Sequence, residues 1–369
     1  MSIKDPHLRT PSGKPRLRAF ALALDGTPGR FNAITDVPGV TVGYSTLISG
    51  DGPLQVGTGP IRTGVTAILP RLRGELATPV FAGVFSQNGN GELTGTHIIE
   101  ETGAFSLPIT ITNTHSCGVA RDGTLRWMQR VLPAALDSAW GLPVAAETYD
   151  GFLNDINGQH VNFEHVAAAL DGATGGAIEE GSVGGGTGMI SFGFKAGSGT
   201  ASRIVEWHDS RYTVGVFVQA NFGKRRNFTL RGRRIRPELA ARAVFEGTPR
   251  AEKGSIIAIV ASDAPFLAHQ MKRLARRVPL GVAGTGGYGY HSSGDIFLAF
   301  STANSEAALA SGRIARASFI PDVDIDPFFD AVVQAVEEAI LNAVVANEDM
   351  TGRDGNFVPA LPKEWLNNW

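Results

Sequence analysis

The sequence predicts a mixed fold of the α+β class, in which strands and helices stack in layers. Short runs rich in β-branched and aromatic residues, bounded by Gly and Pro, are typical of strands. Apolar residues at helical spacing indicate helices, the longest over residues 326–347. The 46 glycines among 369 residues indicate many turns and close backbone approaches, as expected around a site.

In the first half of the chain, strand patterns outnumber helical ones. Strands are predicted within residues 32–47, 64–71, 79–87 and 107–116. Helices are predicted over 122–133, started by Asp122 and stopped near Pro133, and over 163–172.

The second half alternates strands with longer helices. A strand over 212–223 ends in Asn221, and an arginine-rich stretch then opens the only plausible linker, at roughly 224–254. A strand over 255–262 follows, then a helix over 266–277 with Asp263 as its predicted N-cap. A strand over 295–302 and the long helix over 326–347 complete the chain.

Charge and cysteine content exclude several classes of protein. The formal net charge is −2, so no global field steers the chain toward nucleic acid or an anionic membrane. No stretch approaches the roughly 18 apolar residues of a membrane span. Cys117 is the single cysteine, which rules out an intramolecular disulfide and fits a reducing compartment. We therefore expect a cytoplasmic protein with neither nucleic-acid nor membrane partners.

Motifs for cofactors and metals are weak. "GTGGYG" (284–289) matches a dinucleotide fingerprint, and the preceding "LGVA" could be a strand, but no helical pattern follows it. "GSVGGGTGM" (181–189) lacks the Lys-Ser/Thr ending of a phosphate-binding loop. His97, His115 and Cys117 lack zinc-ligand spacing. We expect no cofactor and no metal.

The junction between Gly254 and Ser255 stands directly before an unbroken apolar run, and it allows two interpretations. One is an ordinary turn that leads into a strand. The other is a new N-terminus exposed by chain cleavage, because an N-terminal serine carries its own base. Its α-amine, with a pKa near 7.7–8.0, can take the proton of its own hydroxyl. The residues around the junction do not decide between the two.

The run "EKGSIIAIVASDAPFLAHQMKRLARR" (252–277) resembles the self-processing L-aminopeptidase/D-esterase family of serine aminopeptidases (DmpA-like), to which β-peptidyl aminopeptidases are related. The resemblance covers almost the whole chain. It extends over further blocks in the same order: "NAITDVPGVTVGYSTL", "TGVTAILPR", "NGNGELTGTHIIEETG", "PITITNTHSCGVARDG", "GSVGGGTGM", "VQANFGKR" and "SSGDIFLAFSTAN".

The resemblance implies a four-layer αββα sandwich like that of N-terminal nucleophile hydrolases, but with different strand connectivity. It also implies self-cleavage between Gly254 and Ser255. An α chain (1–254) and a β chain (255–369) would remain together as one folded domain spanning 1–369. Relatives assemble from several αβ units, so a homo-oligomer is expected.

The family's site residues map onto single positions of this sequence. Ser255 is the implied nucleophile, and Ser293 and Asp295 are the serine and acid that support it. Their i, i+2 spacing at a strand start places both side chains on one face. Asn221 matches the oxyanion-hole position. In "ETYDG", Glu147 and Tyr149 match residues that bind the substrate's free amino group and support the site. Without the resemblance, Glu147 would be interpreted as an exposed loop carboxylate.

The implied activity is release of N-terminal residues from short peptides, aminoacyl amides and esters through an acyl-enzyme at Ser255. Certain β-peptidyl aminopeptidases carry Glu where Asp295 stands, which mildly favours ordinary L-amino acids. A β-peptidyl aminopeptidase is the alternative. An ornithine acetyltransferase-like acyltransferase and a non-catalytic binding module are more distant ones.

Overall fold

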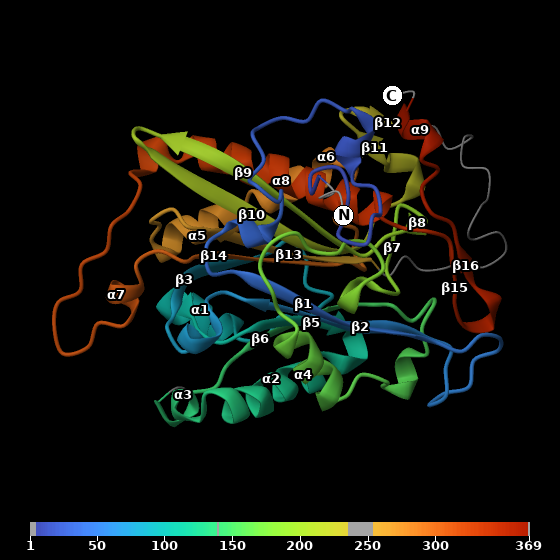
Figure 1. Cartoon of the computed structure of the whole chain (residues 1–369), viewed down its shortest axis with the longest axis horizontal. Helices are drawn as coiled ribbons and strands as arrows, with labels where there is room; N and C mark the ends of the chain where they lie inside the picture. Colours follow the sequence, from blue (N-terminus) through green and yellow to red (C-terminus); the bar gives the residue numbers. More distant parts are fainter. Residues whose placement is uncertain (1–4, 139, 235–253, 368–369) are drawn as a thin grey trace.

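Two β-sheets lie face to face at the centre of the molecule, and helices cover both outer surfaces (Figure 1). The computed structural model describes residues 5–138, 140–234 and 254–367. Within these ranges the layers follow one another as helices, six-stranded sheet, four-stranded sheet, helices. The predicted α+β class and the αββα layering that the resemblance implied are confirmed.

The larger sheet has six strands in the order β4-β3-β14-β13-β10-β9. Only β13 and β14 run parallel, and every other neighbouring pair is antiparallel. Helices α5, α6 and α8 belong to the outer layer over this sheet. The bounds are β4 (Ala104–Phe105), β3 (Val80–Ser86), β14 (Gly294–Ser301), β13 (Ser255–Ser262), β10 (Ser210–Asn221), β9 (Ser198–Trp207), α5 (Ala268–Ala275), α6 (Val278–Gly284) and α8 (Asp326–Val345).

The smaller sheet has four strands in the order β1-β2-β5-β6, with β5 and β6 parallel. Helices α2 and α4 pack on its outer surface, and α3 packs against α2. The bounds are β1 (Thr41–Ser49), β2 (Ile61–Leu69), β5 (Ile109–Asn113), β6 (Val144–Thr148), α2 (Cys117–Val131), α3 (Pro133–Ser138) and α4 (Phe163–Asp171).

Short elements connect and flank these layers. They are α1 (Thr96–Thr102), α7 (Ser305–Ala308), α9 (Glu364–Asn367), β7 (Ile190–Ser191), β8 (Phe194–Lys195), β11 (Thr229–Leu230), β12 (Arg233–Arg234), β15 (Met350–Thr351) and β16 (Phe357–Val358).

The position of β13 between two apolar cores explains why its sequence is apolar without a break. Side chains alternate between the two faces of a strand. Ile257 and Ile259 pack into the core between the sheets, whereas Ile256 and Ala258 pack into the core beneath the helices. Both faces are therefore buried, and no position in the middle of the strand is left for a polar residue.

The predicted strands and the helices over 163–172 and 326–347 are confirmed, but two helix starts were wrong. Helix α2 begins at Cys117 rather than Asp122, because the side chain of Asn113 accepts hydrogen bonds from the N–H groups of His115 and Ser116 just before it. Asp263 does not cap α5, which begins at Ala268. Its carboxylate instead accepts the N–H of Thr213 at 2.7 Å.

Strands β6 and β9 were not predicted, and the segment before "GTGGYG" forms α6 instead of a strand. That glycine run therefore connects a helix to β14, the reverse of the strand-to-helix order of a dinucleotide fingerprint. Most of the predicted linker, residues 235–253, lies outside the described residues. Among the described residues, no helix has the length and apolar character needed to cross a bilayer.

Candidate active site

Ser255 is the first residue of β13 and lies between two neighbouring strands. In the sheet register it stands opposite Asn221 on β10 and opposite Gly294 on β14. Strand alternation puts its side chain on the same face as Ile257, toward the four-stranded sheet. The residue is 4% exposed. Its hydroxyl therefore lies near the end of the layer between the two sheets.

The Ser255 hydroxyl is turned back onto the preceding peptide. Its Oγ donates to the carbonyl oxygen of Gly254 at 2.6 Å. The N of Gly294 lies 3.2 Å from Ser255 Oγ and 3.2 Å from Gly254 O, so this one N–H donates to both oxygen atoms. This amide can stabilise negative charge on that carbonyl oxygen.

Ser293 and Asp295 form a hydrogen-bonded pair beside the same peptide. Ser293 Oγ donates to Asp295 Oδ1 at 2.6 Å, as their shared face predicts. A Cβ atom at Gly254 would lie 3.4 Å from Ser293 Oγ, so the pair flanks the Gly254–Ser255 bond. Burial raises the pKa of the Asp295 carboxyl, while hydrogen bonds from Ser293 and Asn88 act in the opposite direction.

Asn221 has its side-chain amide fixed in one orientation. Its Oδ1 accepts the N–H of Ile190 at 2.9 Å, and its Nδ2 donates to the carbonyl oxygen of Tyr149 at 2.9 Å. Rotating the amide by half a turn would set two acceptors against each other and two donors against each other. The orientation leaves the second Nδ2 hydrogen available to another acceptor.

Glu147 is buried on β6, the edge strand of the smaller sheet, and is only 2% exposed. The alternative of an exposed loop carboxylate is therefore wrong. Its Oε1 accepts the N–H of Glu92 at 3.0 Å, and its Oε2 accepts the hydroxyl of Thr114. Burial raises the pKa of the Glu147 carboxyl, and these two hydrogen bonds act against the increase. Within the described part of the chain, no cationic side chain pairs with it.

Gly91 lies close to both the Glu147 carboxylate and the start of β14. A Cβ atom at Gly91 would lie 3.2 Å from Glu147 Oε1 and 3.2 Å from Gly294 Cα. The Gly294 amide is the one that faces Ser255, so Glu147 belongs to the same small region of the molecule. The structure thus brings the side chains of Glu147, Asn221, Ser255, Ser293 and Asp295 into one region, whereas Tyr149 contributes its backbone carbonyl group, which accepts a hydrogen bond from Asn221.

Asn88 also belongs to the site, although the sequence alone did not indicate it. It accepts the N–H of Asp295 with its Oδ1 at 2.7 Å and donates to Asp295 Oδ2 at 3.3 Å. The segment "QNGNGE" (87–92) is the signal that could have indicated it, because such a polar, Gly-rich segment directly follows a strand.

Asp150 was also missed, although it follows Tyr149 directly. It is 1% exposed, and burial raises the pKa of its carboxyl to about 7. Asn154 donates to its Oδ1 at 3.0 Å, and the interactions of the carboxyl with Thr63 and Asn154 act against this increase in pKa. Lys195 is also fully buried, and burial lowers its pKa. Its ammonium group donates to the carbonyl of Met189, the residue before Ile190.

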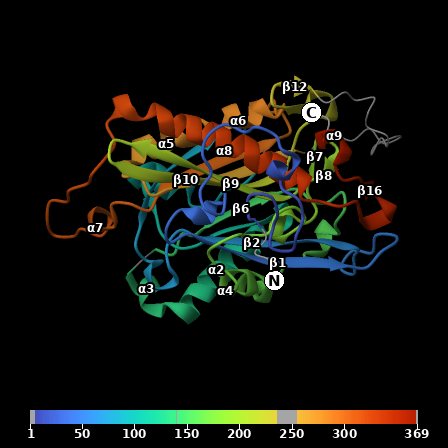
Figure 2. The same cartoon turned by 45° about the horizontal axis from the view of Figure 1, so that its top comes forward.

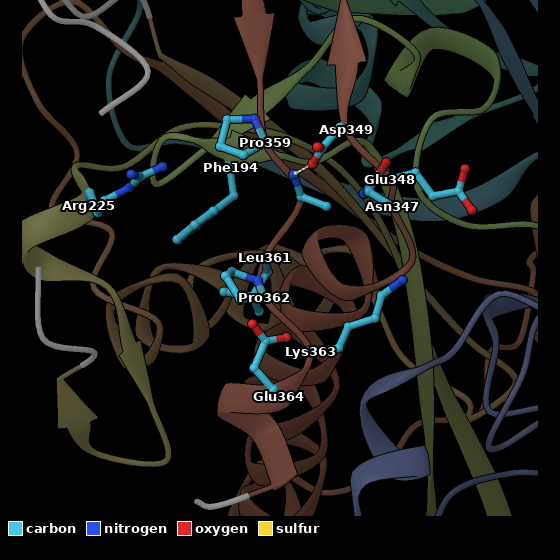
Figure 3. A pocket seen from close by; sticks show the side chains of 11 residues that line it. Phe194, Arg225, Asn347, Glu348, Asp349, Pro359, Leu361, Pro362, Lys363 and Glu364 are labelled. Carbon is cyan, nitrogen blue, oxygen red and sulfur yellow. Dashed lines mark hydrogen bonds between the residues drawn. The ribbon is translucent and has the colours of Figure 1, made fainter. Parts of the chain in front are cut away.

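A separate pocket of about 760 Å³ opens between β8 and the C-terminal segment (Figure 3). It is lined by Phe194, Arg225, Asn347, Glu348, Asp349, Pro359, Ala360, Leu361, Pro362, Lys363 and Glu364. None of these residues belongs to the site around Ser255. Within the described ranges, no three His, Cys, Asp or Glu side chains gather as metal ligands.

Comparisons with known proteins identify the family of the chain. A family model described as peptidase family S58 matches residues 32–358. A protein named beta-peptidyl aminopeptidase BapA, from Sphingosinicella microcystinivorans, is 48% identical over 94% of this chain and 90% of its own length.

Two solved structures share the fold. The L-aminopeptidase D-Ala-esterase/amidase of Ochrobactrum anthropi has a TM-score of 0.88 and 45% identity, covering 96% of this chain and 97% of its own. It is described as a prototype of the serine aminopeptidases and a variant of the Ntn hydrolase fold. A Burkholderia sp. β-aminopeptidase has a TM-score of 0.85 and 43% identity, with the same coverage. This chain is therefore an aminopeptidase that belongs to peptidase family S58.

Proposed function

We propose that the chain cuts itself between Gly254 and Ser255, and that Ser255, as a new N-terminal residue, is the nucleophile of the aminopeptidase. The observation that carries this proposal is the position of the Ser255 hydroxyl. It lies 2.6 Å from the Gly254 carbonyl oxygen, and the Gly294 amide faces both atoms. Ser293 and Asp295 stand beside the same bond.

Self-cleavage proceeds in two steps. Ser255 Oγ attacks the carbonyl carbon of Gly254, and the C–N bond to Ser255 breaks while an ester bond forms. The hydroxyl proton moves to the leaving nitrogen, which becomes the α-amine of Ser255. Water then hydrolyses the ester, leaving a carboxylate on Gly254 and restoring the hydroxyl. The Gly294 N–H stabilises the oxyanion on Gly254 during the attack.

Substrate hydrolysis reuses the same hydroxyl. The neutral α-amine of Ser255 accepts the hydroxyl proton as Oγ attacks the scissile carbonyl of the substrate. The available hydrogen of Asn221 Nδ2 stabilises the oxyanion, and one such donor contributes about 10²–10³ in rate in other enzymes. The leaving amine takes the proton and departs, and water then hydrolyses the acyl-enzyme. Ser293 and Asp295 orient the hydroxyl and the amine.

Glu147 selects substrates with a free N-terminus. Its buried carboxylate receives only neutral hydrogen-bond donors within the described residues, so a substrate ammonium group supplies the opposite charge. Tyr149 supports the site by holding Asn221 through its carbonyl group.

The substrates we propose are short peptides, aminoacyl amides and aminoacyl esters that present ordinary L-amino acids. Asp295 favours this choice, because its acid is one methylene shorter than Glu. The second candidate is a β-peptidyl aminopeptidase, favoured by the 48% identity to a protein of that name. We further propose that the two fragments stay together as one folded unit, and that the enzyme acts in the cytoplasm as a homo-oligomer of such units.

A panel of p-nitroanilides tests the proposal. It contains an L-aminoacyl compound, its N-acetylated form and the corresponding β-aminoacyl compound. We expect hydrolysis of the first and none of the second, because acetylation removes the charge that Glu147 binds. Rapid hydrolysis of the acetylated compound would contradict a site built for free N-termini. Faster turnover of the β-aminoacyl compound would favour the second candidate instead.

A further inference from the structure

Lys195 is a buried lysine that the proposed mechanism does not use. It lies on β8 and is 0% exposed, and no other lysine is buried among the described residues. Lysine side chains are almost never fully buried, because the ammonium group loses its hydration there. A methionine of similar length would fill the same space without that cost. Packing alone therefore does not account for a charged residue at this position.

The ammonium group of Lys195 closes the open end of the β7–β8 hairpin. It donates to the carbonyl oxygen of Met189 at 2.9 Å and to that of Ala196 at 2.5 Å. The N–H of Ala196 donates to the same Met189 oxygen at 3.0 Å. Met189 stands directly before β7 and Ala196 directly after β8, so Lys195 ties the two ends of the hairpin together.

The hairpin lies beside the candidate active site, at the end of the layers opposite to α7 (Figures 1 and 2). Because α7 follows β14 and β13 runs parallel to β14, Ser255 at the start of β13 lies at the same end as the hairpin. Ile190 on β7 donates its N–H to Asn221 Oδ1 at 2.9 Å. Phe222, the residue after Asn221, donates its N–H to Ser191 Oγ at 3.2 Å. The hairpin is thus held against the end of β10 at Asn221.

Asp150 stands next to the other hydrogen-bond partner of the Asn221 amide. Asn221 Nδ2 donates to the carbonyl oxygen of Tyr149, and Asp150 is the following residue. Burial lowers the pKa of Lys195, whereas the negative charge of Asp150 acts to raise it. The two buried groups therefore attract each other. The Asn221 amide is hydrogen-bonded to both of the segments that carry them.

We propose that Lys195 is a positioning residue for the oxyanion hole. By fixing Met189, it sets the position of the Ile190 N–H, and this N–H sets the orientation in which Asn221 Nδ2 meets the oxyanion. The inference rests on the proposed function, in which Asn221 stabilises the oxyanion during substrate hydrolysis. Lys195 acts through Asn221 and not on the substrate. Self-cleavage, which we assign to the Gly294 amide, should not depend on it.

Steady-state kinetics of Lys195→Met on an L-aminoacyl p-nitroanilide test the inference. We expect kcat to fall by about 10- to 100-fold, as for a small misplacement of a catalytic group, while KM changes less than about twofold. The variant should still cut itself and keep a Tm near that of the unaltered protein, because Met189 retains the N–H of Ala196. Lys272→Met is the matched control at an exposed lysine on α5, and it should keep full activity.

A double-mutant cycle with Asn221→Ala separates positioning from a general structural effect. Asn221→Ala alone should lower kcat by about 10²–10³. Adding Lys195→Met should cause little further loss, because the donor that Lys195 positions is already absent. Losses that multiply in the double variant would overturn the inference, as would a Lys195→Met variant that keeps its kcat or fails to cut itself. If Asn221→Ala itself keeps its kcat, the oxyanion role of Asn221 is wrong and the inference falls with it.

Discussion

At the scale of single residues, Glu147 holds a buried carboxylate that only neutral groups contact among the described residues. Removing its charge should leave a substrate ammonium group buried without a partner. We predict that Glu147→Gln lowers kcat/KM by at least roughly 30-fold, the lower limit for breaking a buried charge pair. Glu206→Gln is the control, because that side chain is exposed near the end of β9. Equal losses in both variants would show that the Glu147 charge has no special role.

The same residue should affect the pH dependence of substrate binding. Burial raises the pKa of Glu147, so the carboxylate takes up its proton at a higher pH than an ordinary Glu does. KM should therefore rise as the pH falls toward that raised pKa, and the rise should disappear in Glu147→Gln. Steady-state kinetics over a pH series measure both curves. A KM profile that is the same in the two proteins would exclude Glu147 as the group that binds the ammonium.

Asp150 gives a residue-scale prediction about stability. Its pKa is raised from 3.8 to about 7, so the folded state keeps a proton that the unfolded state has lost. Its contribution therefore lowers the free energy of unfolding as the pH rises from about 4 to about 7. We predict that Asp150→Asn has a Tm close to that of the unaltered protein at pH 4. The Tm of the variant should then become progressively higher up to pH 7, with a constant difference above it. Thermal melts across this pH range measure the Tm difference between the variant and the unaltered protein. A difference that does not change with pH would contradict the raised pKa of Asp150.

At the scale of elements, the start of β14 depends on the absence of a side chain at Gly294. A Cβ atom there would lie 2.4 Å from the carbonyl oxygen of Asn90, a contact that forces the backbone to move. We predict that Gly294→Ala slows self-cleavage, because it displaces the amide that faces Ser255 and Gly254. Gly74→Ala is the control, since no atom lies within 4 Å of the corresponding Cβ position. Cleavage is followed on denaturing gels after expression, and equal rates in both variants would contradict this role.

The elements also show what could be predicted from the sequence. The unbroken apolar run after Ser255 predicted a strand correctly. The run is apolar throughout because both faces of β13 are buried. Strand β6 was missed because "VAAET" contains two alanines, which have low strand propensity, and its pairing with β5 compensates for this. The predicted start of helix α2 was too late in the sequence, because the hydrogen bonds at the N-terminal end come from Asn113 on the preceding strand.

At the scale of the whole molecule, the candidate site is assembled from distant parts of the chain. Glu147 belongs to one sheet, while Asn221, Ser255 and Asp295 come from three strands of the other. No local spacing in the sequence can indicate such an arrangement. Only the resemblance to a known family indicated that these distant residues form one site. Asn88 and Asp150 were missed because their importance depends on which residues surround them.

The whole fold also explains why two fragments would remain associated. Strands β13 and β14, from the proposed β chain, are paired with β10 on one side and β3 on the other, both from the proposed α chain. On the outer layer, Glu338 of α8 accepts hydrogen bonds from Arg18 at 2.7 Å and Arg203 at 2.7 Å. Separating the fragments would break two strand pairings and expose these buried charges.

The most direct test of self-cleavage is the intact mass of the denatured protein, combined with N-terminal sequencing of its smaller fragment. We predict two species, residues 1–254 and 255–369 apart from N-terminal processing, with the smaller beginning Ser-Ile-Ile-Ala. Ser255→Ala should remain uncut and inactive. An active protein that gives one species near 38.9 kDa, with no Ser-Ile-Ile-Ala terminus, would contradict the central claim.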